Sequence, residues 1–358
     1  MEQLRGGGQE PAGLLDIRVQ IQKHEELAFD ALVDYWPSVP GRDSTGEESA
    51  VDCMAIIAKI YWAKIIPSSR PQPQADESEF SRYIWLLFEE KGMSGSWPLR
   101  DSARNRVVSV IRRELGPDFT FETLCRSKIV VDSLWASPDN QLTYPEIKQG
   151  PEHPHGTIVC SGAEMATKGF LEWDGVSCPS LADLTSRVTK ETQLPDNNKL
   201  FVYLQRPSLL EVRFTPGAGC KLSLRDLFQF STDYWVPYKL NESLSRLRKE
   251  GKQAYMLMAV VKHRKSPQDA DCVRVFFEDG MELLPALAAN NPMPDWGFKA
   301  DESIPSGTKL SLYYIPVPHL SPGVVITERK MIYTFPDHMI QGVRDFGLLF
   351  DAKGLEES

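Results

Sequence analysis

The chain has 358 residues, of which 42% are hydrophobic, and a formal net charge of -9 at pH 7. A chain of this length and apolar content can bury a substantial core, which argues against extensive disorder. The acidic balance argues against nucleic acid or an anionic membrane as the main partner, because both reward clustered Lys and Arg, and it suits a protein partner.

The cellular setting is predicted from the apolar runs and the cysteines. No apolar run approaches the roughly 20 residues that a membrane-spanning helix needs, and the opening sequence MEQLRGGGQEPAG lacks the apolar region of a signal peptide. The 6 cysteines include no C-x-x-C pair. We therefore expect reduced thiols, no structural zinc site, no cofactor and a cytoplasmic and/or nuclear location.

The N-terminal part of the chain predicts helices. Residues 16–35 have the apolar spacing of an amphipathic helix. Residues 51–66, VDCMAIIAKIYWAKII, predict a buried helix that Asp52 caps and Pro67 ends. Further helices are predicted at residues 79–91, 99–115 and 120–135.

The C-terminal part predicts mainly strands. Short helices are expected at residues 180–188 and 243–251, and strands at residues 170–178, 199–205, 212–214, 227–238, 255–261, 272–277 and 309–317. The run at 255–261 lacks polar alternation, which predicts a central strand that pairs with residues 272–277. We expect an α+β protein with four parts: residues 1–45, a tail and helix; 46–135, a helical subdomain; 136–320, a β-rich subdomain; and 321–358, a C-terminal extension.

The predicted central strand carries a recognisable pattern, Y-x-L-x-A-V-x-x-H, which is formed by Tyr255, Leu257, Ala259, Val260 and His263. This pattern resembles the C-terminal part of the ubiquitin-specific protease (USP) catalytic domain. In that family, such a strand leads through a loop into a G-H-Y strand that carries the catalytic histidine. Counted from the pattern without gaps, the histidine position falls on Asp271 in this chain.

The resemblance implies a fold. It extends to a strand of the type P-x-x-L-x-x-x-L-x-R-F, matched by Pro195, Leu200, Leu204 and Arg206. The implied fold is papain-like, as in cysteine proteases, with a helical thumb-like N-terminal half and an antiparallel, β-rich, palm-like C-terminal half. Many members hold zinc in their fingers through two C-x-x-C pairs, where this chain has only single cysteines, so short and metal-free fingers are expected.

The candidate nucleophile is Cys53. The family places its cysteine in a motif N-x-G-x-T-C-Y-M/L-N before an apolar helix, and Asp52-Cys53-Met54 is similar to it in outline. The first turn of a helix lowers the pKa of a thiol. In this alignment the family's oxyanion-stabilising Asn falls on Glu48 and its Gly on Ala50, and a carboxylate would repel an oxyanion. The alternative interpretation of Cys53 is a small buried residue of a core helix.

Two functional hypotheses follow. Cysteine-protease chemistry needs a thiolate, an imidazole, a residue that orients the imidazole and an oxyanion hole. Asp271 cannot replace the imidazole, because its charge raises the pKa of a nearby thiol. The favoured hypothesis is a catalytically inactive USP-like domain, a protein-interaction or scaffold module whose candidate partner is ubiquitin or a ubiquitin-like modifier. The alternative is a divergent thiol-dependent deubiquitinase that uses Cys53 and a base from elsewhere, for which His263 is a candidate.

Overall fold

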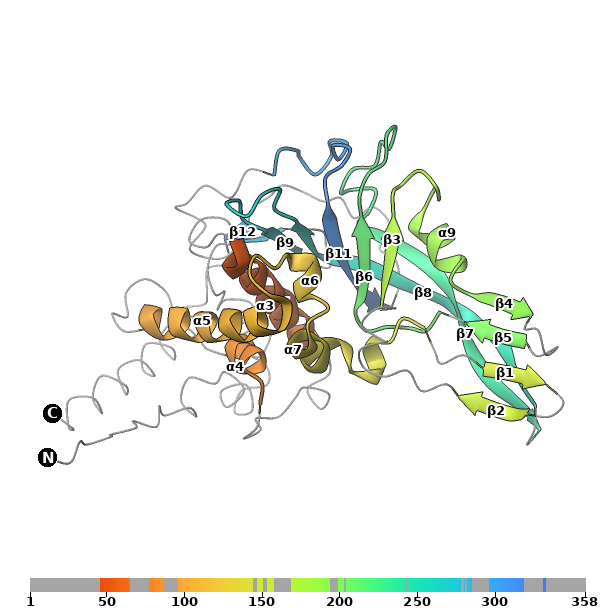
Figure 1. Ribbon diagram of the computed structural model, residues 1–358. Coiled ribbons are helices and arrows are strands. Elements are labelled where there is room, and N and C mark those ends of the chain that lie inside the picture. The colour runs from red at the N-terminus through yellow and green to blue at the C-terminus, as the bar shows by residue number, and fades with distance from the viewer. Residues whose placement is uncertain are drawn as a thin grey trace, which may run out of the picture.

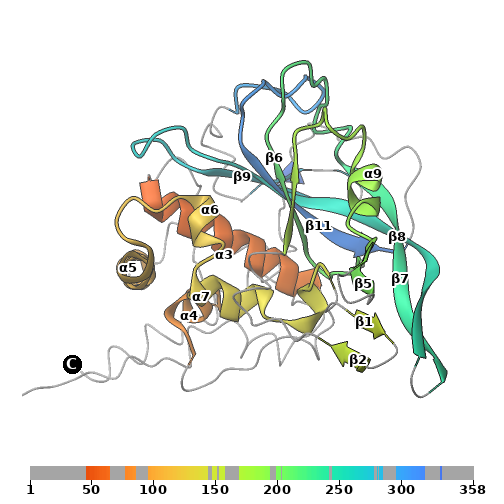
Figure 2. The same ribbon diagram turned by 45° about the vertical axis from the view of Figure 1, so that its right-hand side comes forward.

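The structure is a computed structural model. It describes residues 46–64, 77–85, 96–143, 147–150, 153–157, 169–193, 199–202, 204–241, 244–277, 280, 282–284, 296–318 and 331–332. The predicted helix at residues 16–35 lies outside the described residues. Helices gather at one end of the molecule and a long β-hairpin projects at the other (Figures 1 and 2).

The helical layer is built around one buried helix. Its elements are α3 (Gly46–Lys64), α4 (Glu79–Trp85), α5 (Ser96–Leu115), α6 (Phe121–Leu124), α7 (Lys128–Val130), the π-helix η3 (Val131–Trp135) and the 3-10 helix η4 (Pro138–Asn140). Helix α3 is buried along most of its length and contacts α4, α5 and α6 as well as strands β8 and β9 of the main sheet. Most of its buried residues are apolar, as expected for a core helix, and Glu47, Asp52 and Lys59 are buried among them.

The main sheet has the strand order β12-β10-β9-β8-β11-β6-β3, and β7 pairs with β8 outside this path. Its strands are β3 (Phe170–Trp173), β6 (Leu210–Phe214), β7 (Gln229–Asn241), β8 (Leu244–Lys262), β9 (Cys272–Phe276), β10 (Glu282–Leu284), β11 (Leu310–Val317) and β12 (Met331–Ile332). The β3–β6 and β10–β12 pairs are parallel and the other pairs are antiparallel. Strand β8 is bonded on both sides, which confirms the predicted central strand and its hairpin with β9.

A second, smaller sheet has the order β2-β1-β5-β4 and lies beside the projecting hairpin of β7 and β8 (Figure 1). Its strands are β1 (Ile147–Gly150), β2 (His153–Thr157), β4 (Lys190–Gln193) and β5 (Lys199–Val202). Helix α9 (Leu181–Ser186), which Ser180 caps, packs against β7. The structure is therefore α+β, with a helical layer on one part of a curved, mainly antiparallel sheet.

Aromatic side chains join the two layers. The ring of Tyr313, on β11, stacks on Trp135 of η3 with centroids 6.4 Å apart and meets Phe121 of α6 edge-on. Tyr313 and Phe121 are fully buried. Trp135 and Phe121 belong to the helical layer and Tyr313 belongs to the sheet. Their packing therefore fixes how the two layers meet.

Three expectations differ from the structure. Residues 243–251 were predicted to be helical, but residues 244–250 begin β8, because antiparallel pairing with β7 outweighs the helical preference of its Lys, Arg and Glu residues. The single helix expected at 120–135 is divided after α6, where Ser127 turns its hydroxyl back to the carbonyl of Leu124. The strand expected at 227–238 continues to Asn241 and pairs with β8, which has 19 residues, so these two strands are longer than the sequence predicts.

Candidate functional site

Cys53 is not in the first turn of its helix. Because α3 begins at Gly46, the thiol lies about two turns inside the helix, where the end effect that lowers a thiol pKa has faded. The side chain is 0% exposed. Burial raises the pKa of the Cys53 thiol well above its ordinary value, and the nearby Asp271 raises it further. The placement of Cys53 in the first turn of its helix is therefore wrong, and its burial fits the interpretation of a small core residue.

Asp52 does not cap the helix either, because it lies within α3 and faces α4 and α5. Its carboxylate accepts hydrogen bonds from the hydroxyl of Tyr83 (2.5 Å) and from the guanidinium of Arg104 (3.1 Å). The carboxylate of Glu48 lies 3.2 Å from another nitrogen of Arg104. Asp52 and Glu48 thus hold the helical layer together through one arginine.

The first turn of α3 instead contains Ser49, a residue that the sequence reasoning missed. Its hydroxyl donates a hydrogen bond to the carbonyl of Gly46 (2.7 Å) and accepts one from the backbone N–H of Asp271 (2.9 Å). The Ser49 hydroxyl also lies 3.5 Å from a carboxylate oxygen of Asp271. Both residues are 0% exposed. The structure therefore brings Asp271 to Ser49 by direct contact.

A sequence signal for Ser49 was available. In the motif N-x-G-x-T-C the glycine precedes the cysteine by three positions, as Gly46 precedes Ser49. Gly46 has φ +55, a backbone conformation that glycine adopts without strain, and it starts the helix. A register with Gly46 at the motif's glycine would place Ser49, and not Cys53, at the motif's cysteine.

The carboxyl group of Asp271 is the ionisable group of this site. One oxygen accepts a hydrogen bond from the backbone N–H of Arg264 at 2.9 Å. Burial raises the pKa of Asp271 to about 6, against the opposing effects of the backbone N–H and charge of Arg264 and of the nearby Ser49 hydroxyl. This carboxyl exchanges its proton near neutral pH, but it adjoins a hydroxyl that is already hydrogen-bonded within its own helical turn.

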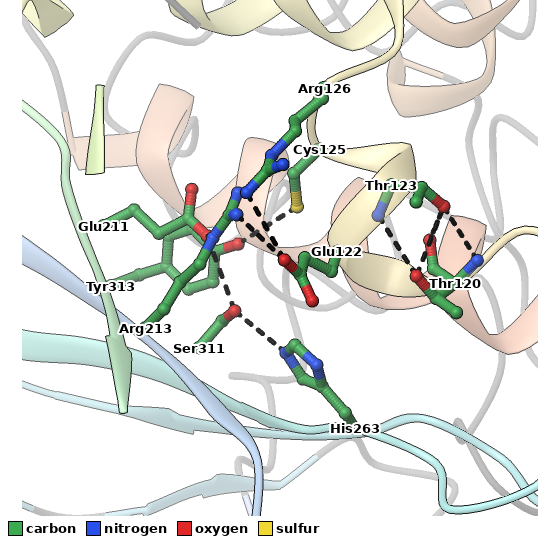
Figure 3. Close-up of polar contacts among 10 residues, drawn as sticks. All are labelled: Thr120, Glu122, Thr123, Cys125, Arg126, Glu211, Arg213, His263, Ser311 and Tyr313. Carbon is green, nitrogen blue, oxygen red and sulfur yellow. Dashed lines mark hydrogen bonds and ion pairs between the residues drawn. The ribbon is translucent and has the colours of Figure 1, made fainter. Parts of the chain in front are cut away.

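His263 lies at the end of β8 and points to a different network (Figure 3). Its Nε2 is 2.9 Å from the hydroxyl of Ser311, and that hydroxyl donates to Glu211 at 3.5 Å. A catalytic triad has the imidazole between hydroxyl and carboxylate. Here the hydroxyl lies between the other two groups, and among the described residues no carboxylate forms a hydrogen bond with the imidazole. Burial and the nearby cation of Arg213 lower the pKa of His263 to about 4, which keeps the ring neutral at physiological pH.

The same network continues to the helical layer (Figure 3). Arg213 donates to Glu211 at 2.9 Å and to Glu122 of α6 at 3.3 Å. The sulfur of Cys125 lies 3.6 Å from the hydroxyl of Tyr313, and burial raises the pKa of this thiol well above its usual range. Each group has a partner from another element, so the cluster joins the sheet to the helices.

In the part of the chain that the structure describes, no three His, Cys, Asp or Glu side chains are grouped as metal ligands would be. The described helices include none with the length and apolar character needed to span a bilayer. Within the described residues, no hydrogen bond joins an imidazole to Cys53 or Ser49.

Comparisons with known proteins gave structural likenesses alone. No protein-family model and no curated protein matches the chain. The PAN2 pseudoubiquitin-hydrolase-RNase module of Saccharomyces cerevisiae is 10% identical over 90% of this chain and 54% of its own, with a TM-score of 0.25, so the chain spans about half of that protein. The SAGA Ubp8/Sgf11/Sus1/Sgf73 DUB module is 9% identical over 83% of this chain and 73% of the other, with a TM-score of 0.32. The PAN2 pseudoubiquitin-hydrolase of Saccharomyces cerevisiae is 9% identical over 81% and 84%, with a TM-score of 0.29.

Proposed function

We propose that this chain is a catalytically inactive USP-like domain that acts as a protein-interaction or scaffold module, with ubiquitin or a ubiquitin-like modifier as the candidate partner. The observation that carries the proposal is the contact between Ser49 and Asp271. The resemblance puts the family's histidine at Asp271, and a register with Gly46 in place of the motif's glycine would put the family's nucleophile at Ser49 and not at Cys53. Ser49 and Asp271 are in contact, as a nucleophile and its base would be, but a hydroxyl beside a carboxylate lacks the chemistry of a thiol beside an imidazole.

The chemistry of the pair supports inactivity. An alkoxide on Ser49 would form next to a buried carboxylate, and like charges in a buried site strongly disfavour each other. The Ser49 hydroxyl also donates its proton to Gly46, which holds it within the helical turn. A general base near neutral pH is normally an imidazole that a carboxylate orients, and His263 belongs to a separate network.

The position of Cys53 weighs against the alternative of a thiol-dependent deubiquitinase. A nucleophilic thiol needs both exposure and a lowered pKa. Cys53 is 0% exposed and its pKa is raised. A substrate carbonyl could reach its sulfur only if α3 separated from α4, α5 and the sheet.

The proposal is tested with a ubiquitin probe that carries a C-terminal electrophile. We expect no covalent adduct from the purified protein, from a Cys53→Ala variant or from a Ser49→Cys variant. The last variant restores a thiol to the proposed nucleophile position but leaves Asp271 in place of the base. An active USP domain serves as the positive control. An adduct that is lost in Cys53→Ala would overturn the assignment of inactivity.

Binding is measured separately by titrating ubiquitin, and then ubiquitin-like modifiers, into the protein in a calorimeter. Saturable binding without hydrolysis would support an interaction module for this class of partner. Absence of binding to every modifier would contradict the partner assignment while leaving the inactivity result intact. The two experiments therefore test the two halves of the proposal independently.

A further inference from the structure

We propose that residues 264–271, in the loop between β8 and β9, form a latch on the first turn of α3, and that this latch opens more readily when Asp271 loses its proton. The segment belongs to the sheet at both ends, and the first turn of α3 belongs to the helical layer. A change at this contact would alter how the two layers are held. This inference does not depend on the proposed function.

The latch consists of contacts between segments distant in sequence. The backbone N–H of Gly46 donates to the carbonyl of Asp269 at 2.9 Å, and that of Asp271 donates to the Ser49 hydroxyl at 2.9 Å. Arg264 reaches further, because its guanidinium donates to the carbonyl of Phe119, just before α6, at 2.6 Å. The segment therefore binds α3 and the start of α6 together.

The Asp271 side chain closes the latch from inside. It accepts the Arg264 backbone N–H, which curls the segment over the carboxyl group, and it contacts the Ser49 hydroxyl. The groups that act electrostatically with it come from each surrounding element: Cys53 on α3, Cys125 at the end of α6, Cys272 on β9 and Arg264 in the segment itself. Burial keeps the three thiols protonated, so the positive charge that faces Asp271 in this set is that of Arg264. His263 precedes the latch and is bonded to Lys309 through its amide and to Ser311 through its ring, so its titration is not part of latch opening.

These groups make the closed latch less stable when Asp271 is ionised than when Asp271 is protonated. A buried carboxylate loses hydration that the Arg264 guanidinium does not fully replace, since that guanidinium is directed to Phe119. Its Nη1 is buried without a hydrogen-bond partner in the described part of the chain. Opening the segment to water restores the hydration of both charges, and ionisation of Asp271 therefore favours opening.

The size of the effect follows from proton linkage. The pKa of Asp271 is about 6 when the latch is closed and returns to its ordinary 3.8 when water reaches it. The stabilisation of the closed form is complete below the lower of these values and is lost as pH rises through the higher one. Each unit of difference changes the opening equilibrium tenfold, so opening should increase up to about a hundredfold between pH 4 and pH 7.

Native-state hydrogen exchange on the full chain tests the latch. The amides of Gly46, Arg264 and residue 271 report opening, after correction for the intrinsic pH dependence of exchange. We expect their protection to fall with rising pH in the wild type and to become independent of pH in Asp271→Asn. The matched control is Asp269→Asn, which removes the same charge from an exposed position of the same segment and should keep the wild-type dependence.

A second variant keeps the test decisive if Asp271→Asn does not fold. Ser49→Ala removes the acceptor of the residue 271 amide, and it should lower protection at every pH while the dependence on pH remains. Protection that does not change with pH in the wild type would overturn the proposal. So would an unchanged dependence in Asp271→Asn, or protection in Ser49→Ala equal to that of the wild type.

Discussion

The guanidinium of Arg104 on α5 lies 3.1 Å from the carboxylate of Asp52 on α3, in a place where Asp52 is 0% and Arg104 is 5% exposed. Truncation of one partner of a buried ion pair leaves the other charge without compensation, which typically costs about 3–5 kcal/mol. We expect Arg104→Ala to lower the free energy of unfolding by this amount in urea titrations. Arg106→Ala, which removes an exposed arginine of the same helix, should cost less than about 1 kcal/mol. Equal costs for the two variants would contradict the assignment.

His263 should make stability depend on pH in the acidic range. Its pKa is about 4 in the folded protein and 6.5 in its ordinary state, so the unfolded chain binds a proton more readily. The stabilisation that results from this pKa difference is complete above pH 6.5 and is lost as pH falls toward 4. We expect the unfolding free energy of His263→Gln to decline less than that of the wild type over this window, in denaturant titrations at matched pH values. Parallel curves would show that the imidazole does not titrate differently in the two states.

Arg274 of β9 and Glu282 of β10 form a two-pronged ion pair, with nitrogen–oxygen distances of 2.9 and 2.6 Å. Both are nearly buried, and the guanidinium also lies 5.5 Å from the centre of the Trp296 ring. A double-mutant cycle with Arg274→Met and Glu282→Gln should give a favourable coupling energy of about 0.5–3 kcal/mol. A coupling energy near zero would mean that the aromatic contact, and not the ion pair, accounts for the cost of losing Arg274.

The described cysteines should differ in reactivity toward a thiol reagent under native conditions. Cys220 is partly exposed, whereas Cys53, Cys125, Cys178 and Cys272 are buried. We therefore expect alkylation of Cys220 before that of the other four, as mapped by mass spectrometry of peptides. The control is the same reaction in denaturant, in which all five should react at comparable rates. Early alkylation of Cys53 in the native protein would contradict its burial and would reopen the thiol-dependent alternative.

Local patterns in the sequence were sufficient for the elements that are decided locally. The apolar run that contains Cys53 predicts a buried helix, and the run from Tyr255 predicts the central strand, because in both cases the residues that fill the core are consecutive. The contact between Ser49 and Asp271 spans 222 positions in the chain. No periodicity reports such a contact, so local patterns did not predict that Asp271 adjoins Ser49. Residues 244–250 were misassigned for a related reason, since their strand conformation depends on β7.

Strand β8 has one further consequence. It runs for 19 residues without interruption, from the projecting hairpin to Lys262 at the latch segment. At about 3.3 Å per residue it is about 60 Å long. A partner that moved the projecting hairpin would therefore move β8. The other end of β8 adjoins the contact between the sheet and α3. Mechanical load applied far from Asp271 would reach it along a single covalent strand.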